Sequence, residues 1–249
     1  MNMKTIYRVR PCEDYTLDEL RNSYLWFSKP TNFKDTDDAN IYAFTLRNRP
    51  ILRGLLAHYC KAAIKEWLKK FSYTGICCFT KVQPTKLERR HFPKCANAGI
   101  CIEFDRKGIE DFFNNHPTTP ISYCFKEVIY DDKPTSLESD GQWHILSWKD
   151  ESGSYYESIL SIILDPKKLE KFVISLLTRI NSKFKDQKEE RIILGGRNID
   201  YKANETGYKI NIPTELIKSV GYYSDTPQQF IDKMKNIDRI ASKLKRIDD

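Results

Sequence analysis

Long hydrophobic runs are missing from this chain of 249 residues. Its apolar runs are only a few residues long, so no segment can cross a bilayer, and the first ten residues lack the continuous apolar core of a signal peptide. The chain has seven cysteines, an odd number without the spacing of a disulfide framework. Reduced thiols in a cytoplasm fit this pattern. We therefore expect a cytoplasmic protein without a membrane segment.

Several short motifs that carry known chemistry are also missing. There is no Gly-x-x-x-x-Gly-Lys-[Ser/Thr] and no Gly-x-Gly-x-x-Gly, which argues against a standard nucleotide-binding loop. Gly-x-Ser-x-Gly is absent, which disfavours an α/β-hydrolase. The chain has no Cys-x-x-Cys pair and only four scattered histidines, so we expect no metal site.

What is present is the composition of a folded protein with many aromatic residues. Hydrophobic residues make up 40% of the chain, and there are 14 Tyr and 13 Phe, which favour strands and stacking surfaces. Lys and Arg number 41 against 34 Asp and Glu, a net charge of +7. This balance attracts phosphate backbones, so nucleic acid is an expected partner, although many basic proteins bind none.

Short strands and helices follow one another along the whole sequence. Strand patterns occupy residues 6–10, 24–28, 75–80, 99–105, 128–130, 208–212 and 219–223, and the apolar triplet after Arg191 predicts another. Thr16 to Glu19 is a capping-box signature for a short helix. Apolar spacing predicts a helix over 51–71, and Asp165-Pro166 opens a helix that we expect to run to about Phe184.

The sequence also predicts a long loop and a terminal helix. Residues 135–154 are expected to form a long loop pinned to the core by its tryptophans. A terminal helix is expected over about 226–247, with one basic face made of Lys233, Lys235, Arg239, Lys243, Lys245 and Arg246. We find no internal repeat and no domain boundary, so we predict a single α+β domain over 1–249.

Three of the predicted strands carry polar residues that suit one cleft. The first carries Tyr7, Arg8 and Arg10, the second ends at Phe27-Ser28, and a late strand opens with Glu189-Glu190-Arg191. A cation would hold a diphosphate, a hydroxyl would fix a strand or a ribose, and a carboxylate would stabilise an oxocarbenium ion. The alternative is that Arg8, Arg10 and Glu189 form a structural ion-pair network.

The chain resembles a large bacterial family catalogued as a domain of unknown function, whose members often occur in mobile or phage-defence loci. In order along most of the chain, the matching pieces are Y-R-V-R (7–10), L-W-F-S-K-P-T-N-F-K-D (25–35), G-I-C-C-F-T (75–80), G-I-C-I-E-F-D (99–105), Ile129-Tyr130 and F-K-D-Q-K-E-E-R-I-I (184–193). The family usually reads Asn-Asp-Pro-Phe where this chain has Lys34 to Asp37. It also usually has a Met-Trp and His-Tyr segment where this chain has His91 to Lys94.

More loosely, the chain resembles the ADP-ribosyltransferase fold, because its strands carry Tyr-Arg, Ser and Glu in that order. The signature strands of that fold carry Arg or His, then Ser or Tyr, then Glu. This resemblance implies a split, mainly antiparallel sheet flanked by helices, with NAD⁺ as the bound substrate. It implicates Glu189, Ser28 and Arg10 in catalysis, with Glu190 the near alternative and Arg191 a structural partner. It implies NAD⁺ binding by Tyr7, Arg8, Arg10, Phe27 and Ser28.

The function implied is an NAD⁺-dependent ADP-ribosyltransferase that acts as an intracellular toxin or phage-defence effector. Its acceptor would be nucleic acid first, with protein close behind, and a cognate antitoxin would be a corollary. Two alternatives stay open. One is a non-catalytic nucleic-acid-binding or sensor module with aromatic residues stacked on bases. The other is a nuclease that uses Glu103, Asp105 and Glu189 as Mg²⁺ ligands.

Overall fold

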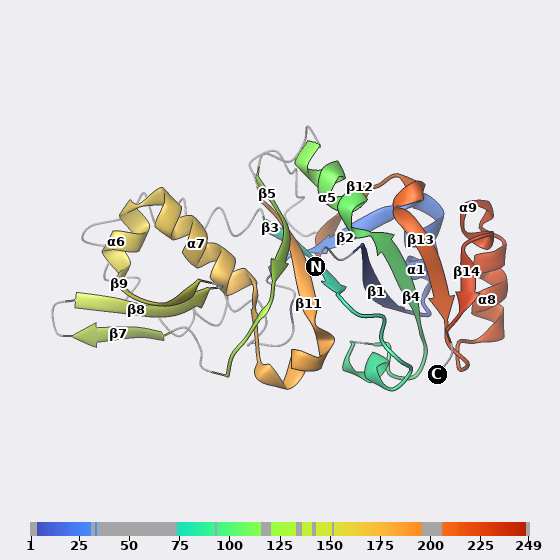
Figure 1. Cartoon of the computed structure of the whole chain (residues 1–249), viewed down its shortest axis with the longest axis horizontal. Helices are drawn as coiled ribbons and strands as arrows, with labels where there is room; N and C mark the ends of the chain where they lie inside the picture. The colour runs from blue at the N-terminus through green and yellow to red at the C-terminus, as the bar shows by residue number, and fades with distance from the viewer. Residues whose placement is uncertain are drawn as a thin grey trace.

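The computed structural model describes residues 4–30, 33, 74–92, 94–115, 121–132, 136–140, 143–150, 152–195 and 206–247. Within these ranges the chain is an α+β protein with a large, mostly antiparallel mixed sheet, which confirms that part of the predicted fold (Figure 1). The helices of these ranges include none that is long and apolar enough to cross a membrane. The helix predicted over 51–71 and the departure at Lys34 to Asp37 lie outside the described residues.

The main sheet has nine strands in the order β12-β2-β3-β1-β4-β13-β14, and β11 joins β3 and β5 off this path. The strands are β1 (Thr5–Pro11), β2 (Tyr24–Ser28), β3 (Thr74–Thr80), β4 (Gly99–Asp105), β5 (Ile121–Glu127), β11 (Glu189–Gly195), β12 (Gly207–Asn211), β13 (Ile217–Tyr222) and β14 (Leu244–Arg246). Every pairing is antiparallel except that of β13 with β14. The strands expected from alternating patterns are thus present.

Strand β3 is the point where the sheet divides. One of its edges pairs with β11 along its full length, from Glu189↔Thr80 to Gly195↔Thr74. The other edge pairs with β1 at Tyr7↔Thr80 and with β2 at Ser28↔Ile76. Strands β1 and β2 therefore separate from each other along this edge of β3.

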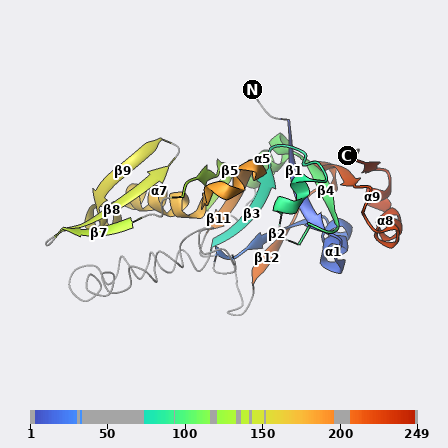
Figure 2. The same ribbon diagram turned by 90° about the horizontal axis from the view of Figure 1, so that it is seen from below.

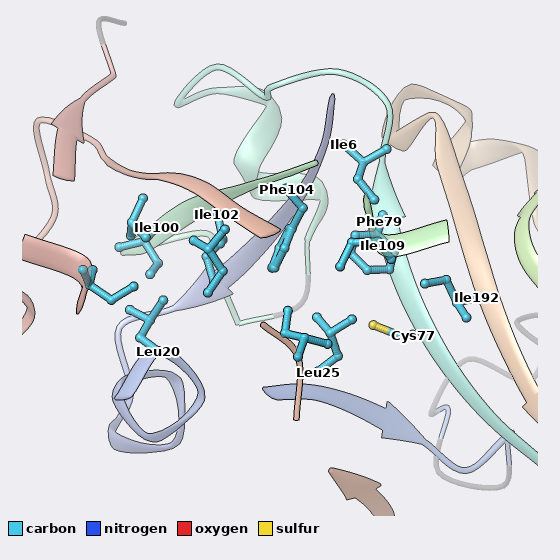
Figure 3. Packing of buried hydrophobic residues seen from close by; sticks show 14 of the residues in the cluster. Ile6, Leu20, Leu25, Cys77, Phe79, Ile100, Ile102, Phe104, Ile109 and Ile192 are labelled. Carbon is cyan, nitrogen blue, oxygen red and sulfur yellow. The ribbon is translucent and has the colours of Figure 1, made fainter. Parts of the chain in front are cut away.

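One face of the main sheet, the core face, carries the hydrophobic core. It presents Ile6 of β1, Phe79 of β3, Ile102 of β4 and Ile192 of β11 (Figure 3). Four helices cover it: α1 (Asp14–Asn22), α5 (Arg106–Asn115), α8 (Gln228–Lys235) and α9 (Asp238–Ala241). Each large apolar side chain buried in this way contributes roughly 1.5–3 kcal/mol. The opposite side, the outer face, presents the alternate residues of each strand.

A second lobe contains a three-stranded sheet and two helices (Figure 1; Figure 2). Its elements are β7 (Ser136–Asp140), β8 (Trp143–Asp150), β9 (Gly153–Ser158), α6 (Ile159–Leu164) and α7 (Pro166–Leu177). The prediction of a loop over 135–154 is therefore wrong. Trp148 does bury its ring, but in a sheet, where it stacks on Tyr155 at 4.3 Å and contacts Phe172 of α7. Its neighbours Ser147 and Lys149 point the other way, as a strand requires.

Helix α7 begins as predicted but ends early. The Asp165 side chain caps it by accepting from the backbone N–H groups of Lys167 and Lys168. After Leu177 the chain forms β10 (Arg179–Ile180), parallel to β6 (Ile129–Tyr130), and then the 3₁₀ helix η3 (Ser182–Gln187). The predicted end near Phe184 is wrong because β6 supplies partners for the chain that leaves the helix.

The capping box predicted at Thr16 is not formed, because α1 begins earlier, at Asp14. Thr16 lies inside the helix, and its hydroxyl donates to the carbonyl of Pro11 at 2.7 Å. Two further short 3₁₀ helices are η2 (Glu88–His91) and η4 (Thr214–Leu216).

The terminal helix predicted over 226–247 is divided into α8, α9 and β14. The helical pattern fails because β14 adds to β13, with Val220 N–H donating to the carbonyl of Lys243 and Ile247 N–H to that of Tyr222, both at 2.9 Å. The residues of the predicted basic face are therefore distributed over α8, α9, β14 and the chain between them. The Lys243 ammonium donates to two backbone carbonyls, and that of Lys245 pairs with Glu103 at 2.7 Å.

Candidate functional site

Arg8 and Arg10 lie on the core face of β1, where both pair with the one carboxylate of Glu19 on α1. Nη1 of Arg8 donates to Oε1 of Glu19, and Nε of Arg10 lies 2.8 Å from Oε2. Glu19 is 2% exposed and Arg8 is 7% exposed. Nη2 of Arg8 also donates to the carbonyl of Trp26 at 3.3 Å. This buried ion pair attaches α1 to the first strand.

Glu189 lies on the opposite, outer face of the same sheet. Thr80 pairs directly with Tyr7 on one side and with Glu189 on the other. Directly paired residues share a face, and successive residues of a strand alternate between faces. Arg8 therefore points away from Glu189. The structure forms neither the predicted arginine–glutamate site nor the alternative network that joins the same residues.

Two further predicted NAD⁺-binding residues, Phe27 and Ser28, are also apart from Glu189. Ser28 shares the outer face, but it pairs with Ile76, four residues along β3 from Thr80 and about 13 Å away. Phe27 is fully buried in the core, where it stacks on Tyr208 at 5.3 Å. Of the predicted set, only Tyr7 lies in line with Glu189.

The structure does bring together a different polar group, which we call the outer row: Glu103 of β4, Tyr7 of β1, Thr80 of β3 and Glu189 of β11. Thr80 is 3% exposed and Glu189 7% exposed, whereas Tyr7 is half-buried. With strands about 4.8 Å apart, the backbones of Tyr7 and Glu189 lie about 10 Å apart. Thr80 is not among the predicted site residues, although it ends a predicted strand.

Glu189 is held firmly at the start of β11. Its backbone N–H donates to the Tyr130 hydroxyl at 2.7 Å, and its carbonyl accepts from Val128 N–H at 3.2 Å. Its Oε1 accepts from Nε of Arg191 at 2.7 Å, and Nη1 of Arg191 donates to the carbonyl of Leu177 at 2.8 Å. Among the described residues, none donates a hydrogen bond to Oε2 of Glu189. Arg191 thus fixes Oε1, whereas Oε2 has no hydrogen-bond donor among the residues that the structure describes.

Glu190, the near alternative, points to the core face instead. Its Oε2 accepts from Nε of Arg106 at 3.2 Å, and its Oε1 lies 4.0 Å from Nζ of Lys81. The Arg106 guanidinium in turn lies over the Phe125 ring at 4.5 Å. Glu190 is 2% exposed, so it is a buried structural carboxylate.

The three carboxylates of the nuclease alternative do not converge. Glu103 and Glu189 are at opposite ends of the outer row, about 14 Å apart at the backbone. Ligands of one ion lie within about 2.6 Å of it, whereas Tyr7 and Thr80 stand between these two carboxylates in the row. Glu103 already accepts from the Ser219 hydroxyl at 2.6 Å and from Lys245. Across the described ranges, no three His, Cys, Asp or Glu side chains could hold a metal ion together.

A cavity of about 130 Å³ lies beside the end of α7, and no predicted site residue lines it. Its walls include Lys126 and Ile129 from the β5–β6 segment and Lys171, Ser175 and Thr178 from α7 and its end. It is separate from the outer row.

Comparisons of the chain with protein-family models, with curated proteins and with solved structures found no match.

Proposed function

We propose that this protein is an NAD⁺-dependent ADP-ribosyltransferase in which Glu189 is the catalytic carboxylate. The observation that supports it is the outer row, where three adjacent strands align an aromatic phenol, a hydroxyl and a carboxylate: Tyr7, Thr80 and Glu189. In this proposal Thr80 takes the role at the ribose that the sequence had suggested for Ser28, and Tyr7 keeps its predicted role in NAD⁺ binding.

The reaction breaks the bond between C1′ of the ribose and the ring nitrogen of nicotinamide. The bonding electron pair leaves with nicotinamide, which becomes neutral, and the ribose becomes an oxocarbenium ion. A nucleophilic atom of the acceptor then bonds to C1′ and loses its proton. A fixed carboxylate stabilises the positive charge and accepts a hydrogen bond from the 2′-hydroxyl, which lowers the barrier.

Each residue of the row has a part in this reaction. Arg191 orients Glu189 through Oε1, so that Oε2 acts on the ribose. The Thr80 hydroxyl donates to the Val82 carbonyl at 3.1 Å, so it takes part as the acceptor of a hydrogen bond from a ribose hydroxyl. The Tyr7 ring supports the nicotinamide by stacking. Arg8 and Arg10 have no role at the diphosphate, since both already pair with buried Glu19.

We extend the proposal to an intracellular toxin or phage-defence effector with nucleic acid as its acceptor. The net charge of +7 favours approach to a polyanion. A toxin of this type needs a neutralising partner, so a cognate antitoxin protein is part of the proposal.

The test is to incubate the purified chain with NAD⁺ labelled in its adenylate phosphate and with separate RNA, DNA and protein fractions. We expect label in a nucleic-acid fraction together with release of free nicotinamide. Label in the protein fraction alone would support the enzymatic activity and show that the acceptor is protein. No label in any fraction and no nicotinamide would overturn the proposal, and binding of unlabelled RNA or DNA under those conditions would favour the non-catalytic module.

A further inference from the structure

Tyr130 of β6 makes a contact that nothing in the proposed reaction uses. Its hydroxyl accepts a hydrogen bond from the backbone N–H of Glu189 at 2.7 Å. Tyr130 lies 59 positions earlier in the chain, so this contact is made only in the folded protein. Burial raises the pKa of the Tyr130 phenol to about 12, so the hydroxyl stays neutral at physiological pH.

The Glu189 N–H needs this acceptor because of the backbone just before it. Lys188 adopts a left-handed conformation with φ of 45°, which turns the chain sharply at the entrance to β11. The Lys188 carbonyl accepts a hydrogen bond from Lys81 N–H at 3.1 Å, on the side of the chain that faces β3. On the other side of the strand, the first N–H of β11 has the phenol as its partner. An unpaired buried N–H would cost folding free energy, so the hydroxyl fixes the strand at this residue.

The segment that carries Tyr130 is itself fixed to the end of α7. Ile129 N–H donates to the Thr178 carbonyl at 2.7 Å, and Asp131 N–H donates to the Ile180 carbonyl at 3.0 Å. A second connection reaches the same helix end, since Arg191 bonds both Glu189 and the Leu177 carbonyl. Two independent connections thus join Glu189 to the C-terminal end of α7.

We propose that Tyr130 is a positioning residue, whose hydroxyl sets the place of the Glu189 carboxylate on the outer row. It does not touch NAD⁺. It holds the backbone from which Glu189 extends, while Arg191 holds the carboxylate. This inference rests on the proposed function, because a position matters for catalysis only if Glu189 is the catalytic group.

The decisive variant is Tyr130→Phe, which keeps the ring and removes the acceptor oxygen. A single hydrogen bond of this kind corresponds to about 1 kcal/mol, so we expect kcat for nicotinamide release to fall about fivefold. The KM for NAD⁺ should change less than twofold, because Tyr130 makes no substrate contact. Tyr156→Phe is the matched control, since Tyr156 is 74% exposed on β9, and it should leave both constants unchanged.

A second measurement tests the hydrogen bond without using activity. Amide hydrogen exchange at Glu189 should be about fivefold faster in Tyr130→Phe and unchanged in Tyr156→Phe. In a Glu189→Gln background, Tyr130→Phe should cause no further loss of turnover. Unchanged exchange at Glu189, or an unchanged kcat in Tyr130→Phe, would overturn the inference.

The failure of the inference and the failure of the proposed function give different results. If Glu189→Gln abolishes turnover and Tyr130→Phe leaves kcat unchanged, only the positioning role is wrong. If Glu189→Gln leaves turnover unchanged, the proposed function is wrong at Glu189, and the positioning role fails with it.

Discussion

Arg8 and Glu189 lie on opposite faces of one sheet, although β1 and β11 both pair with β3 at Thr80. Their partners differ accordingly. Arg8 pairs with Glu19 of α1, and Glu189 pairs with Arg191 on its own strand. This separation assigns a structural role to the arginines of β1 and leaves the outer row as the candidate site.

Replacement of Glu19 should destabilise the protein without acting on the site directly. Glu19→Gln leaves Arg8 and Arg10 without their buried counter-charge, so the free energy of unfolding should fall by about 3–5 kcal/mol. Urea denaturation measures this change, with exposed Glu13→Gln as the control. A change below about 1 kcal/mol would show that this pair is not a main support of α1.

Acid should weaken the ion pair between Arg89 and Asp225. Two hydrogen bonds from the Arg89 guanidinium, at 2.7 and 2.6 Å, lower the pKa of Asp225 below its ordinary value. The stabilisation is therefore complete above the unfolded pKa of about 3.9 and is lost as pH falls through the lower folded pKa. Asp225→Asn should reduce the loss of unfolding free energy between pH 5 and pH 3, measured by urea denaturation at each pH. An identical pH dependence in the two proteins would contradict this account.

The core cysteines should not react with alkylating reagents in the native protein. Burial raises the pKa of Cys77 to about 11 and the pKa values of Cys95 and Cys101 to about 12. At pH 8 their thiolate fractions are about 100-fold or more below that of an ordinary thiol. Mass spectrometry after iodoacetamide should find these three unmodified in native protein and modified in denaturant. Rapid native labelling of Cys101 would show that the sheet opens there.

Two glycines should respond differently to the same change. A Cβ on Gly75 would lie 2.3 Å from Cε1 of Tyr208, whose ring is stacked on Phe27 and cannot withdraw easily. Gly75→Ala should therefore lower the free energy of unfolding by about 1–3 kcal/mol. A Cβ on Gly108 of α5 would lie 2.5 Å from Cδ2 of Leu216 and 3.2 Å from Oδ2 of Asp105, both at the ends of side chains that can move. Gly108→Ala should change stability little, because alanine also favours the helix. Equal thermal denaturation shifts in the two variants would contradict this distinction.

Local patterns predicted most of the strands, because alternation is a property of neighbouring residues. The same alternation contains a second signal, the face of the sheet on which each polar residue lies. Arg8 and Arg10 share the phase of Ile6, so they face the core wherever β1 lies. Likewise Glu190 shares the phase of Ile192, whereas Glu189 does not.

The rest of the site depends on pairings between distant segments, which a single sequence does not encode locally. Nothing near Thr80 in the chain indicates that its strand lies between those of Tyr7 and Glu189. Tyr130 belongs to a strand of two residues, too short to show any alternation. The prediction of a loop over 135–154 was wrong for a related reason. Trp148 is one position of a strand, but its pairing partners on β9 cannot be recognised from the local sequence.

Nicotinamide release by Glu189→Gln, compared with Glu190→Gln, tests the central claim most directly. The two glutamates are adjacent, both are buried, and they face opposite sides of the sheet. The proposed function predicts that Glu189→Gln lowers turnover of NAD⁺ per folded molecule at least 100-fold, as loss of an electrostatic catalytic group does. Glu190→Gln should lower stability and retain turnover per folded molecule. Equal turnover in wild type and Glu189→Gln, or loss of turnover in folded Glu190→Gln alone, would contradict the assignment of Glu189.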